Sequence, residues 1–184
     1  VDPFMLRRNN CRQVHLGVGT GEDVTHCTMP TVALGRAQET WSSAMECTID
    51  WVAADGMAFV AETGSGHLLT MDGAPDGGGR NLAPRPMETV LAGTGGCTAY
   101  DVVLILKRGR QDVTGCRVKV TAERAPVAPK VFTRIHMHFT VSGRNLSADA
   151  VARAVTLSHE KYCSASIMLA KTAEITTSHE VVAA

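Results

Sequence analysis

Residues 86–108 of the chain read PMETVLAGTGGCTAYDVVLILKR. The apolar side chains of this stretch are densest between Val102 and Leu106, which predicts a helix that is buried on most sides. Gly93, Gly95 and Gly96 interrupt the helical pattern. We therefore expect helical structure from about Met87 onwards, with an interruption at the glycines.

Cys97 directly follows the last of these glycines. If the glycines break the helix, the thiol lies at a helix N-terminus, where free N–H groups and the helix dipole favour the thiolate. Asp101, one turn later, acts in the opposite direction because its negative charge disfavours a thiolate. The alternative is a buried helix cysteine after a glycine pair that permits close packing. The local sequence leaves both readings open.

The residues before this helix predict a meander of three short strands. Cys47, Ile49 and Trp51 alternate with polar residues, as on a strand with one solvated face. Residues 57–63 and 67–72 continue as strands on either side of a Gly-Ser-Gly turn. The long loop up to the helix is rich in Gly and Pro, which makes it a candidate lid or substrate-facing loop.

The residues after the helix predict two longer strands and then two helical stretches. Residues 116–122 and 134–141 alternate between apolar and polar side chains. Ser147 can cap a helix through about Lys161, a second helical stretch follows, and residues 174–182 close the chain as a strand. We expect an α+β fold, in which the helices pack on one side of an antiparallel sheet.

The first 44 residues show little sustained periodicity and contain several glycines. We expect residues 1–44 to form a loosely ordered N-terminal extension, in part disordered or not native to the protein. The patterned sequence begins at Met45, so we expect residues 45–184 to form one domain.

The composition excludes several classes of function. Lys+Arg and Asp+Glu balance at 18 each, so the chain has no electrostatic reason to bind nucleic acid or an anionic membrane. No apolar run approaches the roughly 18–20 residues that a membrane span needs. The first twenty residues also lack the order of a secretory signal. We therefore expect a soluble, cytoplasmic protein.

The six cysteines, at positions 11, 27, 47, 97, 116 and 163, are widely scattered. No two of them are separated by only two residues, which argues against a zinc knuckle or a thioredoxin-type motif. His136 and His138 share one face of a predicted strand, but the sequence offers no third ligand beside them. We expect no metal ion and no cofactor.

Cys163 lies where the first helix after Ser147 gives way to the next. His159 is four residues earlier, and therefore on the same helical face if the helix is continuous. An imidazole in that place could accept the thiol proton. The alternative is an ordinary, partly exposed surface histidine.

Two motifs together make the sequence recognisable. The run from Pro86 through Gly95-Gly96-Cys97-Thr98-Ala99-Tyr100-Asp101 to Val103, together with Glu160-Lys161-Tyr162-Cys163-Ser164, resembles the OsmC/Ohr family, and most closely its YhfA-like branch. The resemblance covers about residues 45–184. Two motifs at the expected separation are much more specific than a single cysteine.

The resemblance implies an OsmC-like fold, an intertwined homodimer in which the two cysteines approach each other, and reduction of organic hydroperoxides in oxidative-stress defence. Cys97 would attack the peroxide and become a sulfenic acid, Cys163 would condense with it to a disulfide, and a dithiol reductant would restore both. An apolar pocket for an organic hydroperoxide or another small apolar ligand would be lined by Met87, Val90, Leu91 and Ile167.

The sequence departs from the family pattern at one point. Peroxidatic members carry a Glu ten residues before the first cysteine, paired with an Arg from the N-terminal strands. Here Met87 occupies that place, the candidate carboxylate Glu88 is nine residues before Cys97, and no Arg occurs between Met45 and Gly79. Two other readings therefore stay open: a non-enzymatic binding or redox-sensing protein, and a structural dimer with inert thiols.

Overall fold

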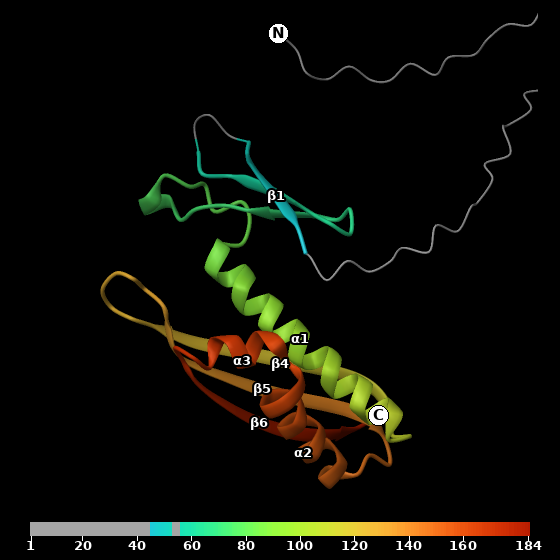
Figure 1. Cartoon of the computed structure of the whole chain (residues 1–184). Helices are drawn as coiled ribbons and strands as arrows, with labels where there is room; N and C mark the ends of the chain where they lie inside the picture. The colour runs from blue at the N-terminus through green and yellow to red at the C-terminus, as the bar shows by residue number, and fades with distance from the viewer. Residues whose placement is uncertain (1–44, 53–55) are drawn as a thin grey trace, which may run out of the picture. The chain divides into compact units, whose positions relative to one another are not determined.

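Figure 1 shows the computed structural model of the chain, which describes residues 45–52 and 56–184. Within these residues the elements follow the predicted order of three strands, a helix, two strands, helical segments and a last strand. The fold is α+β, as expected, but its strands form two separate three-stranded sheets. The predicted extension of residues 1–44 lies outside the described residues.

The first sheet is the predicted antiparallel meander. It consists of β1 (Cys47–Trp51), β2 (Phe59–Thr63) and β3 (Leu68–Met71), in that order. Large apolar side chains of its outer strands are exposed to solvent: Trp51 is 56% exposed and Leu68 is 69% exposed. The described residues of the chain therefore leave apolar surface of this sheet exposed.

The loop after β3 is held at its base by a buried carboxylate. Asp72 is 1% exposed and accepts hydrogen bonds from the backbone N–H groups of Gly73 at 2.7 Å, Arg80 at 3.1 Å and Leu82 at 3.0 Å. These N–H donors, that of Leu82 first, hold the pKa of Asp72 below its usual value. A short 3₁₀ helix, η1 (Pro75–Gly77), lies within the loop. The segment predicted as a lid is thus tied to the end of β3.

The second sheet contains β4 (Asp112–Arg124), β5 (Phe132–Arg144) and β6 (Glu174–Ala183), with β5 in the middle. β4 and β5 are antiparallel, whereas β5 and β6 are parallel. The prediction of a purely antiparallel sheet is therefore wrong. Helices connect β5 to β6 and return the chain to the end of the sheet where β5 began, and such a crossover makes two neighbouring strands parallel.

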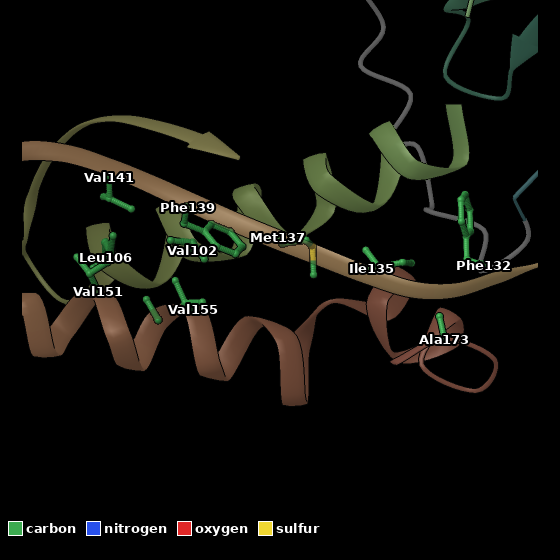
Figure 2. Close-up of a cluster of buried hydrophobic side chains, with 11 residues drawn as sticks. Val102, Leu106, Phe132, Ile135, Met137, Phe139, Val141, Val151, Val155 and Ala173 are labelled. Carbon is green, nitrogen blue, oxygen red and sulfur yellow. The ribbon is translucent and has the colours of Figure 1, made fainter. Parts of the chain in front are cut away.

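The hydrophobic core lies between β5 and the helices, of which α2 spans Ala148–Leu157. Alternate residues of β5, among them Met137 and Phe139, are fully buried, while the intervening Arg134 and His136 are exposed. Figure 2 shows the buried side chains of β5 meeting those of the helices. The labelled residues are Val102, Leu106, Phe132, Ile135, Met137, Phe139, Val141, Val151, Val155 and Ala173.

The longest helix, α1 (Pro86–Arg108), runs without a break through its three glycines. The predicted interruption is therefore wrong. A Cβ atom at Gly95 would lie 2.8 Å from Cγ2 of Val120 on β4, whereas a Cβ at Gly93 or Gly96 would meet nothing within 4 Å. Since normal carbon contacts are about 3.5–4.0 Å, Gly95 allows α1 to lie close to the sheet.

By length and composition alone, α1 is also apolar enough to cross a membrane. That observation is weak, because the central helix of a soluble core has the same properties. Here Val102 and Leu106 of α1 are buried in the core described above.

Two short helical segments follow α2. The first, η2 (Ser158–Tyr162), is a π-helical turn, and the second is α3 (Ser164–Leu169). Both pack against α1, as Figure 1 shows for α3. Single π-helical turns occur frequently at functional sites. Here the turn ends at Cys163, which it brings next to α1.

Candidate functional site

Cys97 lies near the middle of α1, and not at a helix N-terminus. Because α1 is continuous, the N–H groups of the residues around Cys97 are engaged within the helix, so the predicted activation by the helix dipole does not apply. The side chain is partly exposed. A reagent can therefore reach this thiol from outside.

Cys163 occupies the junction between η2 and α3. It is the N-cap residue of α3, and its sulfur accepts a hydrogen bond from the backbone N–H of Ser166 at 3.4 Å. Its side chain is completely buried. The extended backbone of Cys163 ends the π-helical turn and starts α3, which fixes where the sulfur points.

The fold brings the two thiols together with a carboxylate. The sulfurs of Cys97 and Cys163 and a carboxylate oxygen of Asp101 all lie within 4.8 Å of one another. Both cysteines are free. Asp101 is one turn after Cys97 on α1, so both project from the same face of the helix. The family resemblance implied that the cysteines meet in an intertwined dimer, whereas here a single chain supplies both sulfurs.

The surroundings of Cys97 favour the thiol over the thiolate. Burial raises the pKa of Cys97 above its usual value, and the neighbouring Cys163 and Asp101 raise it further. The backbone N–H of Ala165 in α3 donates to the Cys97 sulfur and acts in the opposite direction. The sequence predicted two opposing effects on the pKa of Cys97. The lowering by a helix dipole is absent, and the raising by Asp101 is present.

A buried hydroxyl belongs to the same site. Ser158 is completely buried, and its Oγ lies 3.2 Å from the carbonyl oxygen of Thr98 and 3.4 Å from Oδ2 of Asp101. Its single proton can be donated to either oxygen. Ser158 could not be predicted from the sequence, because the π-helical turn that carries it has no distinct sequence pattern. For Asp101 the sequence predicts only the effect of its charge.

His159 is not part of the group of thiols and carboxylate that the structure assembles. It lies in the π-helical turn, is partly buried, and its Nδ1 has no hydrogen-bond partner among the described residues. The predicted role assumed a regular helix between His159 and Cys163. The π-helical turn changes that spacing.

Glu88 is exposed and is engaged at the start of α1. Its Oε2 accepts a hydrogen bond from the backbone N–H of Arg85, the N-cap residue, at 2.9 Å. Nine residues of an α-helix separate it from Cys97, which is about 13 Å along the axis. The structure therefore does not bring this candidate carboxylate to the thiols.

The predicted pocket residues are divided between two environments. Met87 and Leu91 line a cavity of about 470 Å³ together with residues of the loop after β3 and of the second sheet. Val90 and Ile167 lie outside this cavity and are 44% and 37% exposed. Within the part of the chain that the structure describes, the four side chains do not line one pocket.

His136 and His138 lie on the face of the second sheet that points away from the helices, as the strand pattern predicted. The hydroxyl of Ser178 on β6 joins them, at 2.9 Å from Nε2 of His136 and 2.8 Å from Nδ1 of His138. Nε2 of His138 also lies 3.6 Å from Glu180. Hydroxyl and carboxylate partners thus occupy these ring nitrogens.

The chain is similar to known proteins in both sequence and fold. A family model described as OsmC-like protein matches residues 77–178. Protein YhfA of Escherichia coli K12 is 54% identical over 140 residues, which cover 76% of this chain and 100% of that protein. A solved structure of a hypothetical protein from Aquifex aeolicus VF5 is 27% identical with a TM-score of 0.66, and the match covers 78% of this chain and 99% of that one.

A further solved structure shares the fold alone. It is described as an organic hydroperoxide resistance protein OsmC from Legionella pneumophila, is 15% identical with a TM-score of 0.55, and matches 74% of this chain and 96% of its own. The fold, the two cysteine motifs and the matches in sequence agree with one another. This chain belongs to the OsmC-like family.

Proposed function

We propose that the protein is a cytoplasmic, thiol-dependent peroxidase that reduces organic hydroperoxides with Cys97 and Cys163. The observation that carries the proposal is the pair of free thiols from distant parts of one chain, whose sulfurs lie within 4.8 Å of each other. A protein of the same fold is described as an organic hydroperoxide resistance protein. The reaction needs two sulfurs in this arrangement.

The difference in burial supports this division of roles between the two cysteines. Cys97 is partly exposed, so a peroxide can reach it, whereas Cys163 is completely buried. Cys97 attacks one oxygen of the peroxide, the O–O bond breaks, and the other oxygen leaves with a proton as the alcohol. Cys163 then attacks the Cys97 sulfenic acid, which gives a disulfide and water. A dithiol reductant returns both residues to thiols.

Exposed apolar side chains on the two helices next to the cysteines favour an alkyl or fatty-acid hydroperoxide over hydrogen peroxide. Val90 lies on α1 and Ile167 on α3, both outside the cavity that Met87 and Leu91 line. A homodimer would cover these exposed side chains, since burial of apolar surface drives association. We therefore include homodimerisation in the proposal, with the pocket completed by the second copy.

The test treats the fully reduced protein with cumene hydroperoxide and follows the cysteines by mass spectrometry. A Cys97–Cys163 disulfide should form in the wild type. Cys97→Ser should abolish turnover, and Cys163→Ser should leave a sulfenic acid at Cys97 that dimedone traps. Cys116→Ser is the matched control, because Cys116 is a partly exposed thiol on β4. If neither sulfenic acid nor disulfide appears, the proposal is wrong.

A second function deserves a test because burial and the neighbouring acids raise the pKa of Cys97. A thiol that holds its proton is poorly suited to attack, which favours a non-enzymatic binding or redox-sensing protein. This alternative predicts negligible turnover with any dithiol. It also predicts that native mass spectrometry detects an apolar ligand retained by the purified protein.

A further inference from the structure

We propose that the reduced form of the protein binds one Zn²⁺ ion through Cys97, Asp101 and Cys163. The proposal concerns the reduced thiols only and does not depend on peroxidase activity. It also differs from the expectation drawn from the sequence, where the scattered cysteines offered no metal-binding motif. The ligands come together only in the folded chain.

The geometry is close to that of a zinc site. The three donor atoms lie within 4.8 Å of one another. Zn–S bonds of about 2.3 Å at tetrahedral angles place two sulfur ligands about 3.8 Å apart, so the sulfurs need to move closer by roughly 1 Å at most. A small rotation of the partly exposed Cys97 side chain can supply this shift.

The charge of the site favours a cation. Its two thiols and one carboxylate are all acids, and ionising them together places like charges side by side, which is costly. Among the described residues, Asp101 forms no ion pair that would offset this charge. A divalent cation would satisfy all three groups and would deprotonate both thiols, as zinc does with cysteine ligands.

The donor set selects the type of metal. Two thiolates favour a soft or borderline ion over Mg²⁺ or Ca²⁺, and one carboxylate oxygen is compatible with zinc. Three protein ligands leave the fourth tetrahedral position for water. The partial exposure of Cys97 and Asp101 gives solvent access to that position.

Hydrogen bonds already orient the proposed ligands. The backbone N–H of Ser166 donates to the sulfur of Cys163 at 3.4 Å. The buried hydroxyl of Ser158 lies 3.4 Å from Oδ2 of Asp101. Such partners of the ligands are a regular part of protein metal sites, because they fix the direction of each donor atom.

The experiment titrates the reduced, full-length chain with Co²⁺ under anaerobic conditions and then displaces the cobalt with Zn²⁺. One equivalent of Co²⁺ should give thiolate-to-cobalt charge-transfer absorption, and one equivalent of Zn²⁺ should remove it. Loss of a hydrogen-bond partner of a metal ligand typically weakens metal binding by roughly 10–100-fold. Cys97→Ser and Cys163→Ser each remove a ligand itself, so each should weaken binding by more than this. Asp101→Asn should weaken it by at least about tenfold.

Two control variants separate this site from other thiols and acids. Cys116→Ser changes another partly exposed cysteine, and Asp149→Asn changes an exposed acid in the first turn of α2. Both should bind cobalt as the wild type does. Circular dichroism of every variant checks that the fold is intact.

The proposal is overturned if the folded wild type takes up no cobalt or zinc at one equivalent. It is also overturned if folded Cys97→Ser or Cys163→Ser binds as tightly as Cys116→Ser. No peroxide enters the titration, so failure of the zinc site and failure of the peroxidase proposal are read from separate measurements.

Discussion

A substitution of Gly95 by Ala tests how α1 is placed against the second sheet. The new Cβ would lie 2.8 Å from Cγ2 of Val120, which is at least about 0.7 Å inside normal contact distance. Val120 is β-branched and sits on a strand, so its side chain has few other rotamers to adopt. Overpacking of this kind typically costs about 1–3 kcal/mol of unfolding free energy.

Replacing a helical Gly by Ala also gains about 1 kcal/mol, because Ala has the higher helix propensity. The two effects oppose each other at Gly95, and we expect a net loss of up to about 2 kcal/mol. At Gly93 and Gly96 a Cβ meets nothing within 4 Å. Gly93→Ala and Gly96→Ala should therefore keep the gain and stabilise the protein by up to about 1 kcal/mol each.

The assay is urea unfolding at one fixed chain concentration, because self-association would make the apparent stability depend on concentration. Gly95→Ala should be the least stable of the three variants by about 1–3 kcal/mol. If all three glycine variants gain equal stability, the close approach of α1 and β4 is refuted. Gly95 is also two residues from Cys97, so its variant should slow formation of the Cys97–Cys163 disulfide more than Gly93→Ala does.

Three further predictions concern the thiol, the helix cap and the core. The pKa of Cys97 is raised, so alkylation of this thiol by iodoacetamide should begin at a higher pH than alkylation of a free cysteine. Asp101→Asn should shift this pH profile towards neutrality, whereas the control Asp149→Asn should leave it in place. Because the folded thiol holds its proton more tightly than the unfolded one, this group's contribution to stability should be lost as the pH rises through the folded pKa. Glu88→Ala removes the hydrogen bond from the backbone N–H of Arg85 and should cost about 1 kcal/mol in urea unfolding, whereas Glu88→Gln should keep that bond. If Glu88→Gln nevertheless stops peroxide-driven disulfide formation, Glu88 acts in the chemistry as the sequence predicted. Leu106 is 1% exposed in the core, so Leu106→Ala should lower the free energy of unfolding by about 2–5 kcal/mol. The control Leu82→Ala changes a side chain that is 77% exposed and should lower it by less than about 0.5 kcal/mol. Equal losses in thermal or urea unfolding would contradict the assigned core.

Local patterns predicted the elements well where burial alternates. The polar and apolar residues of β4 and β5 gave both strands, and Ser147 accepts a hydrogen bond from the N–H of Ala150 at the start of α2, as its predicted capping role requires. The prediction of an interruption at the glycines of α1 is wrong because helix propensity describes an isolated helix. A helix can contain a few glycines when its tertiary packing leaves no room for a side chain, as at Gly95.

Features that depend on long-range contacts could not be read from the sequence. The parallel pairing of β5 with β6 follows from the path of the helical connection, which strand patterns do not encode. Ser158 enters the site because a π-helical turn directs it towards Asp101, 57 residues earlier in the chain. The pairing of Cys97 with Cys163 was implied only by the family resemblance, since the spacing of two cysteines does not determine their distance in space.

The same feature of the site underlies both proposals. Cys97 and Cys163 are close enough to form a disulfide, and Asp101 beside them makes the reduced site acidic without a compensating ion pair among the described residues. Such a site can lower its electrostatic cost by keeping protons on sulfur, by forming a disulfide, or by binding a cation. Each of these states uses the sulfur electron pairs that the other two require. The proposed peroxide reduction and the proposed zinc binding would therefore compete for one pair of thiols.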